Sequence, residues 1–255
     1  MKIDKKLYVF DMDGTIYLGE NAFPFAVSYI KKLRRQGRRV LFFTNNASKS
    51  PEFYIKRLTR MGFEPRQDEL LTSGDVTVRF LKEKRAGKSV YLLGTQLLKQ
   101  SFADAGIILS DNADIVVSSF DTELTYEKLE RACTLIRGGA EYLCTHPDFN
   151  CPTETGFIPD SGAIAAAITA STGVKPRFFG KPYADTAEMI FSYTGIEAKD
   201  ACIFGDRLYT DIALGKNSGM TAVLVLSGET KKSELDGLST EQMPDIVLDS
   251  IKDLL

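Results

Sequence analysis

The stretch Leu7-Tyr8-Val9-Phe10-Asp11-Met12-Asp13-Gly14-Thr15 decides the fold of this chain. Its first four residues are apolar or aromatic and predict a buried strand. Two carboxylates spaced by two follow at once; on an extended segment they point the same way, and Gly14 lets the chain turn sharply. A calcium-binding EF-hand loop is excluded, because the sixth and twelfth positions counted from Asp11 hold Ile16 and Ala22 instead of Gly and Glu. The stretch therefore predicts a strand that ends in a pair of carboxylates.

Short apolar strands alternate with helical segments along the rest of the chain. Near-continuous apolar strands separated by helices are typical of a parallel sheet covered by helices on both faces. We therefore expect an α/β protein whose core is a doubly wound, Rossmann-like parallel sheet, with ligands bound beyond the carboxyl ends of its strands. The predicted strands are 7–10, 40–43, 89–93, 115–118, 141–145, 201–204, 221–226 and 246–248, and the predicted helices include 24–36, 51–61, 129–136 and 162–170.

Two polar motifs stand after later apolar runs. Thr44, Asn45 and Asn46 follow the second predicted strand and offer a hydroxyl, two amides and backbone N–H groups suited to an oxyanion or a phosphate. Taken alone, Asn-Asn after a strand is more often just a turn. Gly180-Lys181-Pro182 is not a P-loop, because Lys175 stands where a Walker A motif requires glycine and proline follows the lysine.

Two further carboxylates follow the strand that ends at Phe204. Asp206 comes directly after Gly205, and Asp211 stands at a predicted helix start, where a carboxylate also caps backbone N–H groups. A hard divalent cation such as Mg²⁺ prefers one or two carboxylates plus phosphate oxygens. Phosphoryl transfer needs a nucleophile, cationic groups and a proton donor. The residues after the predicted strands include each of these parts.

The composition excludes several other classes of site. His146 is the single histidine, so a His-rich metal site cannot be built within one chain, and a Ser-His-Asp triad would have to use it. The four cysteines form no C-x-x-C pair and are expected to be reduced and mostly buried. With 32 basic and 34 acidic residues, the chain is no polycation for nucleic acid. No secretory segment and no apolar run of about 20 residues is present, so we expect a cytoplasmic protein without a membrane partner.

In this order, the motifs around Asp11, Thr44, Lys181 and Asp206 resemble those of the haloacid dehalogenase superfamily of aspartate-nucleophile phosphatases, in its NagD-like and 4-nitrophenylphosphatase-like branch. The resemblance implies that Asp11 attacks phosphorus to form an aspartyl-phosphate. It implies that Asp13 first protonates the leaving oxygen and then activates water. Asp11, the backbone carbonyl of Asp13, and Asp206 would bind Mg²⁺.

The same resemblance assigns roles to the remaining motif residues. Thr44 and Lys181 would hold the transferring phosphoryl group, with Asn45 and Asn46 beside it. Asp211 would support Lys181 or the metal ligands. Gly14 would support the site through the turn that it allows after the carboxylate pair.

The resemblance also explains the long gap between the second and third motifs. In this branch a second α/β domain, a C2-type cap, is inserted there; it excludes water and selects the leaving group. We expect residues 1–78 and 179–255 to form the catalytic core and residues 79–178 to form the cap.

One segment of the expected cap, residues 145–152, is the candidate for contact with substrate. Its candidate specificity residues are His146, Asp148 and Cys151. His146 is expected to be a specificity or structural residue and not a catalytic base. Pyridoxal-phosphate phosphatases of this branch tend to carry histidine at the position of Cys151, which argues against that substrate.

We therefore expect a Mg²⁺-dependent phosphatase that hydrolyses small phosphate monoesters such as sugar phosphates, nucleoside monophosphates and 4-nitrophenyl phosphate. Two alternatives stay open: a phosphotransferase or mutase on the same core, and a receiver-like phosphoacceptor module. A dehalogenase is disfavoured, because it has no use for Asp13 or Asp206. A homodimer is compatible with the branch, and no nucleic-acid polymer is expected as a partner.

Overall fold

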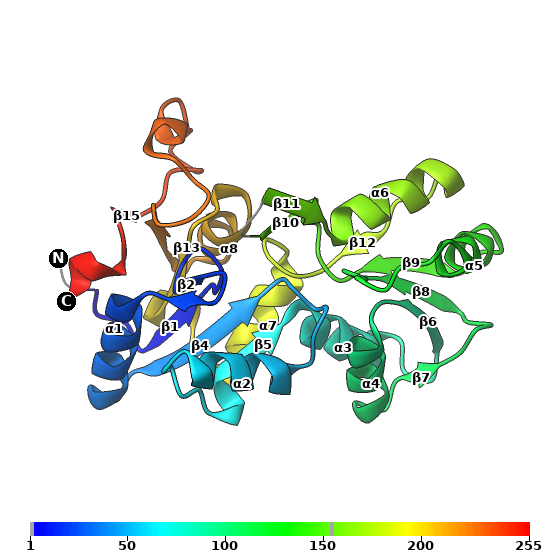
Figure 1. Cartoon of the computed structure of the whole chain (residues 1–255), viewed down its shortest axis with the longest axis horizontal. Helices are drawn as coiled ribbons and strands as arrows, with labels where there is room; N and C mark the ends of the chain where they lie inside the picture. The colour runs from blue at the N-terminus through cyan, green and yellow to red at the C-terminus, as the bar shows by residue number, and fades with distance from the viewer. Residues whose placement is uncertain (1–2, 154–155) are drawn as a thin grey trace. The chain divides into compact units, whose positions relative to one another are not determined.

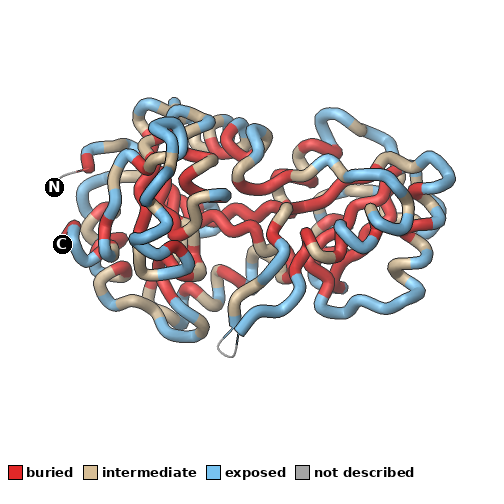
Figure 2. The backbone as a smooth tube through the Cα atoms, turned by 90° about the horizontal axis from the view of Figure 1, so that it is seen from above, coloured by how far each residue is buried: buried red, intermediate tan, exposed pale blue. Residues whose placement is uncertain are grey.

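The computed structural model describes residues 3–153 and 156–255, which divide into two compact units (Figure 1). Unit 1 comprises Met1–Thr44, Glu52–Leu71 and Lys181–Leu255, and unit 2 comprises Asn45–Pro51 and Thr72–Gly180. In both units the buried residues concentrate on the strands (Figure 2). None of the helices within the described ranges has both the length and the apolar character needed to span a membrane.

Unit 1 is built on a six-stranded sheet with the order β15-β14-β13-β1-β4-β5. The pairings of β1 with β4 and β13, of β13 with β14, and of β14 with β15 are all parallel. The strands are β1 (Leu7–Phe10), β4 (Arg39–Thr44), β5 (Leu70–Thr72), β13 (Ala201–Gly205), β14 (Thr221–Val225) and β15 (Ile246–Leu248), with a short hairpin of β2 (Tyr17–Leu18) and β3 (Asn21–Ala22).

Helices cover both faces of this sheet. On one face Tyr29 of α1 lies edge-on to Phe10, which stacks on Phe204 with ring centroids 4.8 Å apart. On the other face Gly215 of α8 lies against Ile203 and Ala222 so closely that a Cβ would not fit. The helical segments are α1 (Pro24–Arg35), α2 (Pro51–Arg60), η1 (Gln67–Glu69), α7 (Ala184–Thr194), η2 (Ala198–Asp200), η3 (Leu208–Ile212), α8 (Ala213–Ser218), η4 (Lys232–Leu235) and η5 (Ile251–Leu254).

Unit 2 has its own five-stranded sheet with the order β12-β9-β8-β6-β7, and all its pairings are parallel. Helices α5 and α6 lie on one side of it and α3 and α4 on the other (Figure 1). The elements are α3 (Ser73–Lys84), β6 (Ser89–Leu93), α4 (Gln96–Asp104), β7 (Ile108–Leu109), β8 (Ile115–Ser118), α5 (Tyr126–Arg137), β9 (Glu141–Cys144), β10 (Asn150–Thr153), β11 (Gly156–Pro159), α6 (Ser161–Thr172) and β12 (Arg177–Phe178).

The α/β fold with doubly wound parallel sheets is confirmed, and each predicted strand is present with ends that differ by at most one residue. The antiparallel hairpin β10–β11 is not among the predicted strands, because Pro152 and Pro159 are poor strand formers. The short strands β5, β7 and β12 were also missed, since two or three residues carry no periodicity.

The expected start of the inserted domain, residue 79, lies inside α3. This helix begins at Ser73, after Thr72, whose hydroxyl accepts from the backbone N–H of Asp75 while the Asp75 carboxylate accepts from that of Thr72. The longer segment of unit 2 begins at Thr72, the residue that caps this helix. The bounds of the core and of the inserted domain stay a prediction.

Candidate active site

The carboxyl edge of the unit 1 sheet brings the predicted strand-end residues together. β1, β4 and β13 are parallel and in register, with Phe10 opposite both Phe42 and Phe204. Asp11 follows β1, Thr44 ends β4, and Asp206 follows β13. Because the strands end at one edge, residues from distant parts of the sequence share one site.

Asp11, Asp206 and Asp211 form a carboxylate cluster at this edge. One oxygen of each carboxylate lies within 4.8 Å of the others. Asp211 comes from η3, a π-helical turn between β13 and α8, and such turns are frequent at functional sites. Asp206 and Asp211 are buried, and Asp11 is partly exposed.

Lys181 places its ammonium inside this cluster. Its Nζ lies 2.5 Å from Oδ1 of Asp11 and 2.6 Å from Oδ1 of Asp211, and it donates to the carbonyl oxygen of Phe43 at 3.4 Å. Burial by itself lowers the pKa of Lys181, but the two carboxylates outweigh burial and the pKa is raised. The lysine is therefore charged, and it is a buried part of the site and not a solvated side chain.

The carboxylates carry more negative charge than Lys181 offsets. Burial raises the pKa of Asp11 well above its usual range, an effect that Lys181 opposes. Burial, and then the neighbouring Asp211, raise the pKa of Asp206 to about 7. Such shifts mean that crowded, buried carboxylates are poorly stabilised as anions. An added cation would stabilise them.

Asp206 is held in a tight cradle. The backbone N–H of Glu229 donates to its Oδ2 at 2.7 Å. Gly14, at φ +82°, and Gly228 pack so closely on the carboxylate that a Cβ at either position would collide with it. Its Oδ1 is buried and has no hydrogen-bond partner among the described residues. A hard cation suits a fixed carboxylate with an oxygen left over.

Asp13 lies in a different environment from Asp11. The hydroxyl of Tyr17 donates to Oδ2 of Asp13 at 3.0 Å, and the guanidinium of Arg57 stacks over the Tyr17 ring at 4.7 Å. Burial raises the pKa of Asp13, while Arg57 and Tyr17 oppose that rise. A raised pKa favours the protonated carboxyl that a general acid needs. Sequence reasoning missed Tyr17, and its place four residues after Asp13 was the available signal.

Thr44 is buried at the end of β4. The adjacent carbonyl oxygen of Phe43 accepts from Lys181, so the end of β4 and the lysine lie together. Thr15, another residue that sequence reasoning did not single out, donates its hydroxyl to Oδ2 of Asp11 at 3.4 Å.

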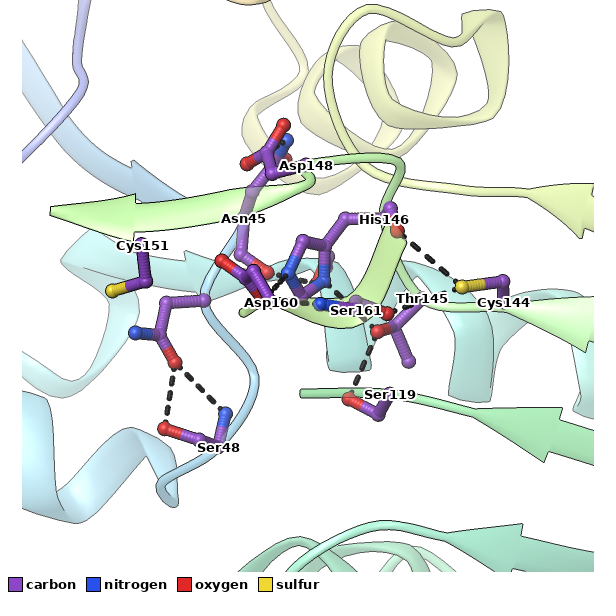
Figure 3. A network of polar contacts seen from close by, with 12 residues as sticks. Asn45, Ser48, Ser119, Cys144, Thr145, His146, Asp148, Cys151, Asp160 and Ser161 are labelled. Atoms are coloured by element: carbon purple, nitrogen blue, oxygen red, sulfur yellow. Dashed lines mark hydrogen bonds and ion pairs between the residues drawn. The ribbon is translucent and has the colours of Figure 1, made fainter. Parts of the chain in front are cut away.

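Asn45 and Asn46 belong to unit 2, where the side chain of Asn45 lies beside that of Asp148 (Figure 3). Nδ2 of Asn45 donates to Oδ2 of Asp148 at 3.2 Å. Oδ1 of Asn46 accepts from the backbone N–H of Ser48 at 2.9 Å and from its hydroxyl at 2.7 Å, which is a typical Asx turn. Phosphate binding by these two residues stays a prediction.

The candidate specificity residues differ in burial. His146 is fully buried, with Nε2 2.9 Å from Oδ1 of Asp160 and Nδ1 3.0 Å from the hydroxyl of Thr145 (Figure 3). These surroundings favour the structural alternative for this histidine. Asp148 is also buried, and Cys151 on β10 is partly exposed. All four cysteines are free thiols.

His146, Asp148 and Asp160 also lie close enough to ligate one metal ion. However, both ring nitrogens of His146 already face polar partners at hydrogen-bonding distance. An ion would have to displace one of them. The carboxylate cluster of unit 1, with the spare oxygen of Asp206, is therefore the better cation site of the two.

The comparisons with known proteins agree with this geometry. Residues 8–108 match a family described as haloacid dehalogenase-like hydrolase, and residues 178–254 match one described as HAD-hydrolase-like. An acid sugar phosphatase from Staphylococcus aureus (strain MRSA252) is 35% identical over 98% of this chain and 95% of its own length. A 5′-nucleotidase from Bacillus subtilis (strain 168) is 33% identical over 90% of both chains.

Solved structures with a similar fold include a phosphatase as well. The crystal structure of a 4-nitrophenylphosphatase from Thermotoga maritima superposes with a TM-score of 0.93, at 40% identity, over 98% of this chain and 96% of that one. Both the sequence and the structural likeness extend over essentially the whole chain. The chain therefore belongs to the haloacid dehalogenase-like hydrolases, in their NagD-like and 4-nitrophenylphosphatase-like branch.

Proposed function

We propose that this protein is a Mg²⁺-dependent phosphatase that hydrolyses small phosphate monoesters through an aspartyl-phosphate on Asp11. The observation that carries this proposal is the buried ammonium of Lys181 between Asp11 and Asp211. A charged lysine fixed beside a carboxylate nucleophile is the arrangement that can hold a phosphoryl group for attack.

In the first step a carboxylate oxygen of Asp11 attacks phosphorus, an O–P bond forms, and the bond to the leaving oxygen breaks. The protonated carboxyl of Asp13 gives its proton to that oxygen. In the second step the Asp13 carboxylate takes a proton from water as this water attacks the aspartyl-phosphate, which releases phosphate and regenerates Asp11. Tyr17 orients Asp13 through its hydrogen bond.

Lys181 and Thr44 are proposed to bind the oxygens of the phosphoryl group as it is transferred. Asp211 forms an ion pair with Lys181, with Oδ1 2.6 Å from Nζ, and so helps to hold the ammonium in place. Both side chains of this pair are buried. Thr44 ends β4, Lys181 precedes α7, and Asp211 lies in η3.

The donor set fits a divalent cation. Asp11, Asp206 and the backbone carbonyl of Asp13 would hold Mg²⁺, and the unpartnered, buried Oδ1 of Asp206 suits this ion. When bound, Mg²⁺ supplies positive charge that stabilises the negative phosphate oxygens.

The substrate class is proposed from the relatives. Their names indicate a sugar phosphate, a nucleotide and 4-nitrophenyl phosphate as substrates of those proteins. We extend this range to the present chain, with unit 2 in the role of the cap that excludes water and selects the leaving group. A cytoplasmic location and a homodimer stay predictions.

The nucleophile is tested by Asp11→Asn, with turnover of 4-nitrophenyl phosphate as the measurement. The amide cannot form an acyl phosphate in the same way, so activity should fall by at least about 10³-fold with the fold intact by circular dichroism. Asp111→Asn, an exposed carboxylate in unit 2, is the matched control and should retain activity. Turnover by Asp11→Asn close to that of the wild type would refute the assignment.

A further inference from the structure

The carboxyl edge of the unit 2 sheet is occupied by the chain itself. In doubly wound sheets this edge is where ligands bind. Here Thr95, which follows β6, donates its hydroxyl to the carbonyl oxygen of Ser48 at 2.7 Å, and Ser73 donates to that of Asn45 at 2.5 Å. The segment Asn45–Pro51, which arrives directly from Thr44, is thus anchored where another protein would bind a ligand.

Gly180 is packed against the same segment. It has φ +72°, and a Cβ there would lie 2.6 Å from Oδ1 of Asn45 and 3.1 Å from the carbonyl oxygen of Thr145. No side chain fits at this position. Two of the four places where the chain passes between the units, Thr44–Asn45 and Gly180–Lys181, are therefore held together on the unit 2 side.

His146 holds the loop that follows β9 in place through its contact with Asp160 (Figure 3). A Cβ at Gly180 would lie 3.1 Å from Cβ of His146, so the two residues pack closely. The imidazole bonds Asp160 at 2.9 Å, and Asp160 also accepts from the backbone N–H of Ser161 at 2.6 Å as the cap of α6. The histidine thereby connects the loop after β9 to a helix start.

Asp148 extends the same support to Asn45. It stands two residues beyond His146 and accepts from Nδ2 of Asn45 at 3.2 Å. The loop from His146 to Asp148 lies against α6, where the backbone N–H of Gly162 donates to the carbonyl oxygen of Asp148 at 2.8 Å. A Cβ at Gly162 would collide with the carbonyl of Pro147, so the loop has little freedom to move.

We propose that His146, Asp148 and Gly180 are positioning residues for Thr44 and Lys181, which are joined to this junction by one peptide bond each. The inference rests on the proposed phosphatase function. Since Thr44 and Lys181 would bind the phosphoryl group that all substrates share, a disturbed junction should impair every substrate alike. A role for His146 and Asp148 in choosing the leaving group would instead impair some substrates more than others.

The test compares three variants, His146→Gln, Asp148→Ala and Gly180→Ala, on 4-nitrophenyl phosphate, a hexose phosphate and a nucleoside monophosphate. We expect kcat/KM to fall by about tenfold or more, by the same factor for each substrate, and the Ki of inorganic phosphate to rise. Unequal factors, or unchanged kcat/KM and Ki, would overturn the proposal.

Two further variants separate positioning from loss of folding. Tyr142→Phe removes a buried hydroxyl that lies 3.0 Å from that of Ser118 in the same sheet, and it should lower Tm without changing the Ki of phosphate. Asp160→Asn retains a good cap for α6 but alters the partner of His146, and it should raise that Ki in folded protein. A Ki that simply follows Tm across all these variants would count against positioning.

The outcomes also distinguish this inference from the proposed function. A wild-type protein that hydrolyses none of the three esters contradicts the phosphatase proposal. In that case calorimetric titration with inorganic phosphate still compares the wild type with the variants. An active wild type with substrate-dependent losses in the variants contradicts the positioning proposal alone.

Discussion

At the scale of single residues, the site depends on two carboxylates of the same stretch lying in different surroundings. Asp11 faces an ammonium and two further carboxylates, whereas Asp13 faces a tyrosine hydroxyl and the field of Arg57. The two residues are two positions apart in the sequence, and both follow β1. Their environments can therefore separate a nucleophile from an acid, which identical groups in identical surroundings could not do.

Removing the Tyr17 hydroxyl should change the pH dependence of the reaction. Burial raises the pKa of Asp13, and the bond from Tyr17 opposes that rise. In Tyr17→Phe the pKa should rise further, so the acid stays protonated to higher pH. The alkaline limb of the pH profile of kcat/KM should move upward relative to the wild type.

The control for this experiment is Tyr126→Phe, which alters an exposed tyrosine of unit 2. Its pH profile should match that of the wild type. A downward shift of the alkaline limb in Tyr17→Phe would contradict the assignment of Asp13 as the acid.

At the scale of elements, the turn after β14 and the turn after β1 cooperate to hold Asp206. Gly14 and Gly228 both contact its carboxylate, and Ser227 donates to the carbonyl oxygen of Gly14 at 2.8 Å. The turns belong to strands that are not neighbours in the sheet order, because β13 lies between them. The cradle therefore forms only when the whole sheet is assembled.

Gly228→Ala should weaken metal binding. The new methyl group would occupy the place of the Asp206 side chain, so the carboxylate must move. We expect the Mg²⁺ concentration at half-maximal activity to rise by about tenfold, measured by titration of the metal-free enzyme. Gly106→Ala, whose Cβ would meet open space although its φ of +82° is strained for alanine, should lose some stability without a change in the metal titration.

Asp245 links α8 to the strands that follow it. It accepts from Nζ of Lys216 at 2.7 Å and from the backbone N–H of Ala222 at 2.8 Å. Burial raises its pKa, but these two bonds outweigh burial and the pKa is lowered. Asp245→Ala should reduce the free energy of unfolding by about 0.5–1 kcal/mol near neutral pH, at the low end because the pair is partly exposed.

The sign of the pH dependence follows from the lowered pKa of Asp245. Its contribution to stability is present above the pKa of an unfolded aspartate and is lost as pH falls through the lower folded value. The difference between wild type and Asp245→Ala in urea unfolding should therefore shrink in acid. If the difference in the free energy of unfolding grew on acidification, Asp245 would not be stabilised as a carboxylate by its two bonds.

At the scale of the whole molecule, two parallel sheets use their carboxyl edges differently. The edge in unit 1 gathers carboxylates and a lysine, whereas in unit 2 Thr95, which follows β6, donates to Ser48 of the segment Asn45–Pro51. Fold alone therefore does not make a site; the side chains at the strand ends do.

Removal of the metal should affect both activity and stability. Chelation by EDTA should abolish turnover of 4-nitrophenyl phosphate, and added Mg²⁺ should restore it. Since the cation would relieve repulsion among the buried carboxylates, Mg²⁺ should also raise Tm, as any ligand of the native state does. In Asp206→Asn this rise in Tm should be much smaller, and full activity of the wild type in EDTA would refute the metal role.

Much of the site could be predicted because it depends on strand ends. Asp11, Thr44 and Asp206 follow apolar runs whose period is visible locally, and parallel strands bring such residues to one edge. The hairpin β10–β11 was not predicted, because its prolines obscure the strand pattern.

By itself, the sequence determined the α/β class, the order of the strands along the chain and which carboxylates follow the strands, since these depend on local patterns of apolar and acidic residues. Only the tertiary structure decided that Lys181 lies between Asp11 and Asp211, that Gly228 cradles Asp206, and that His146 is buried beside Gly180. These contacts join residues far apart in the sequence, and their distances depend on how the assembled sheets bring the chain back on itself.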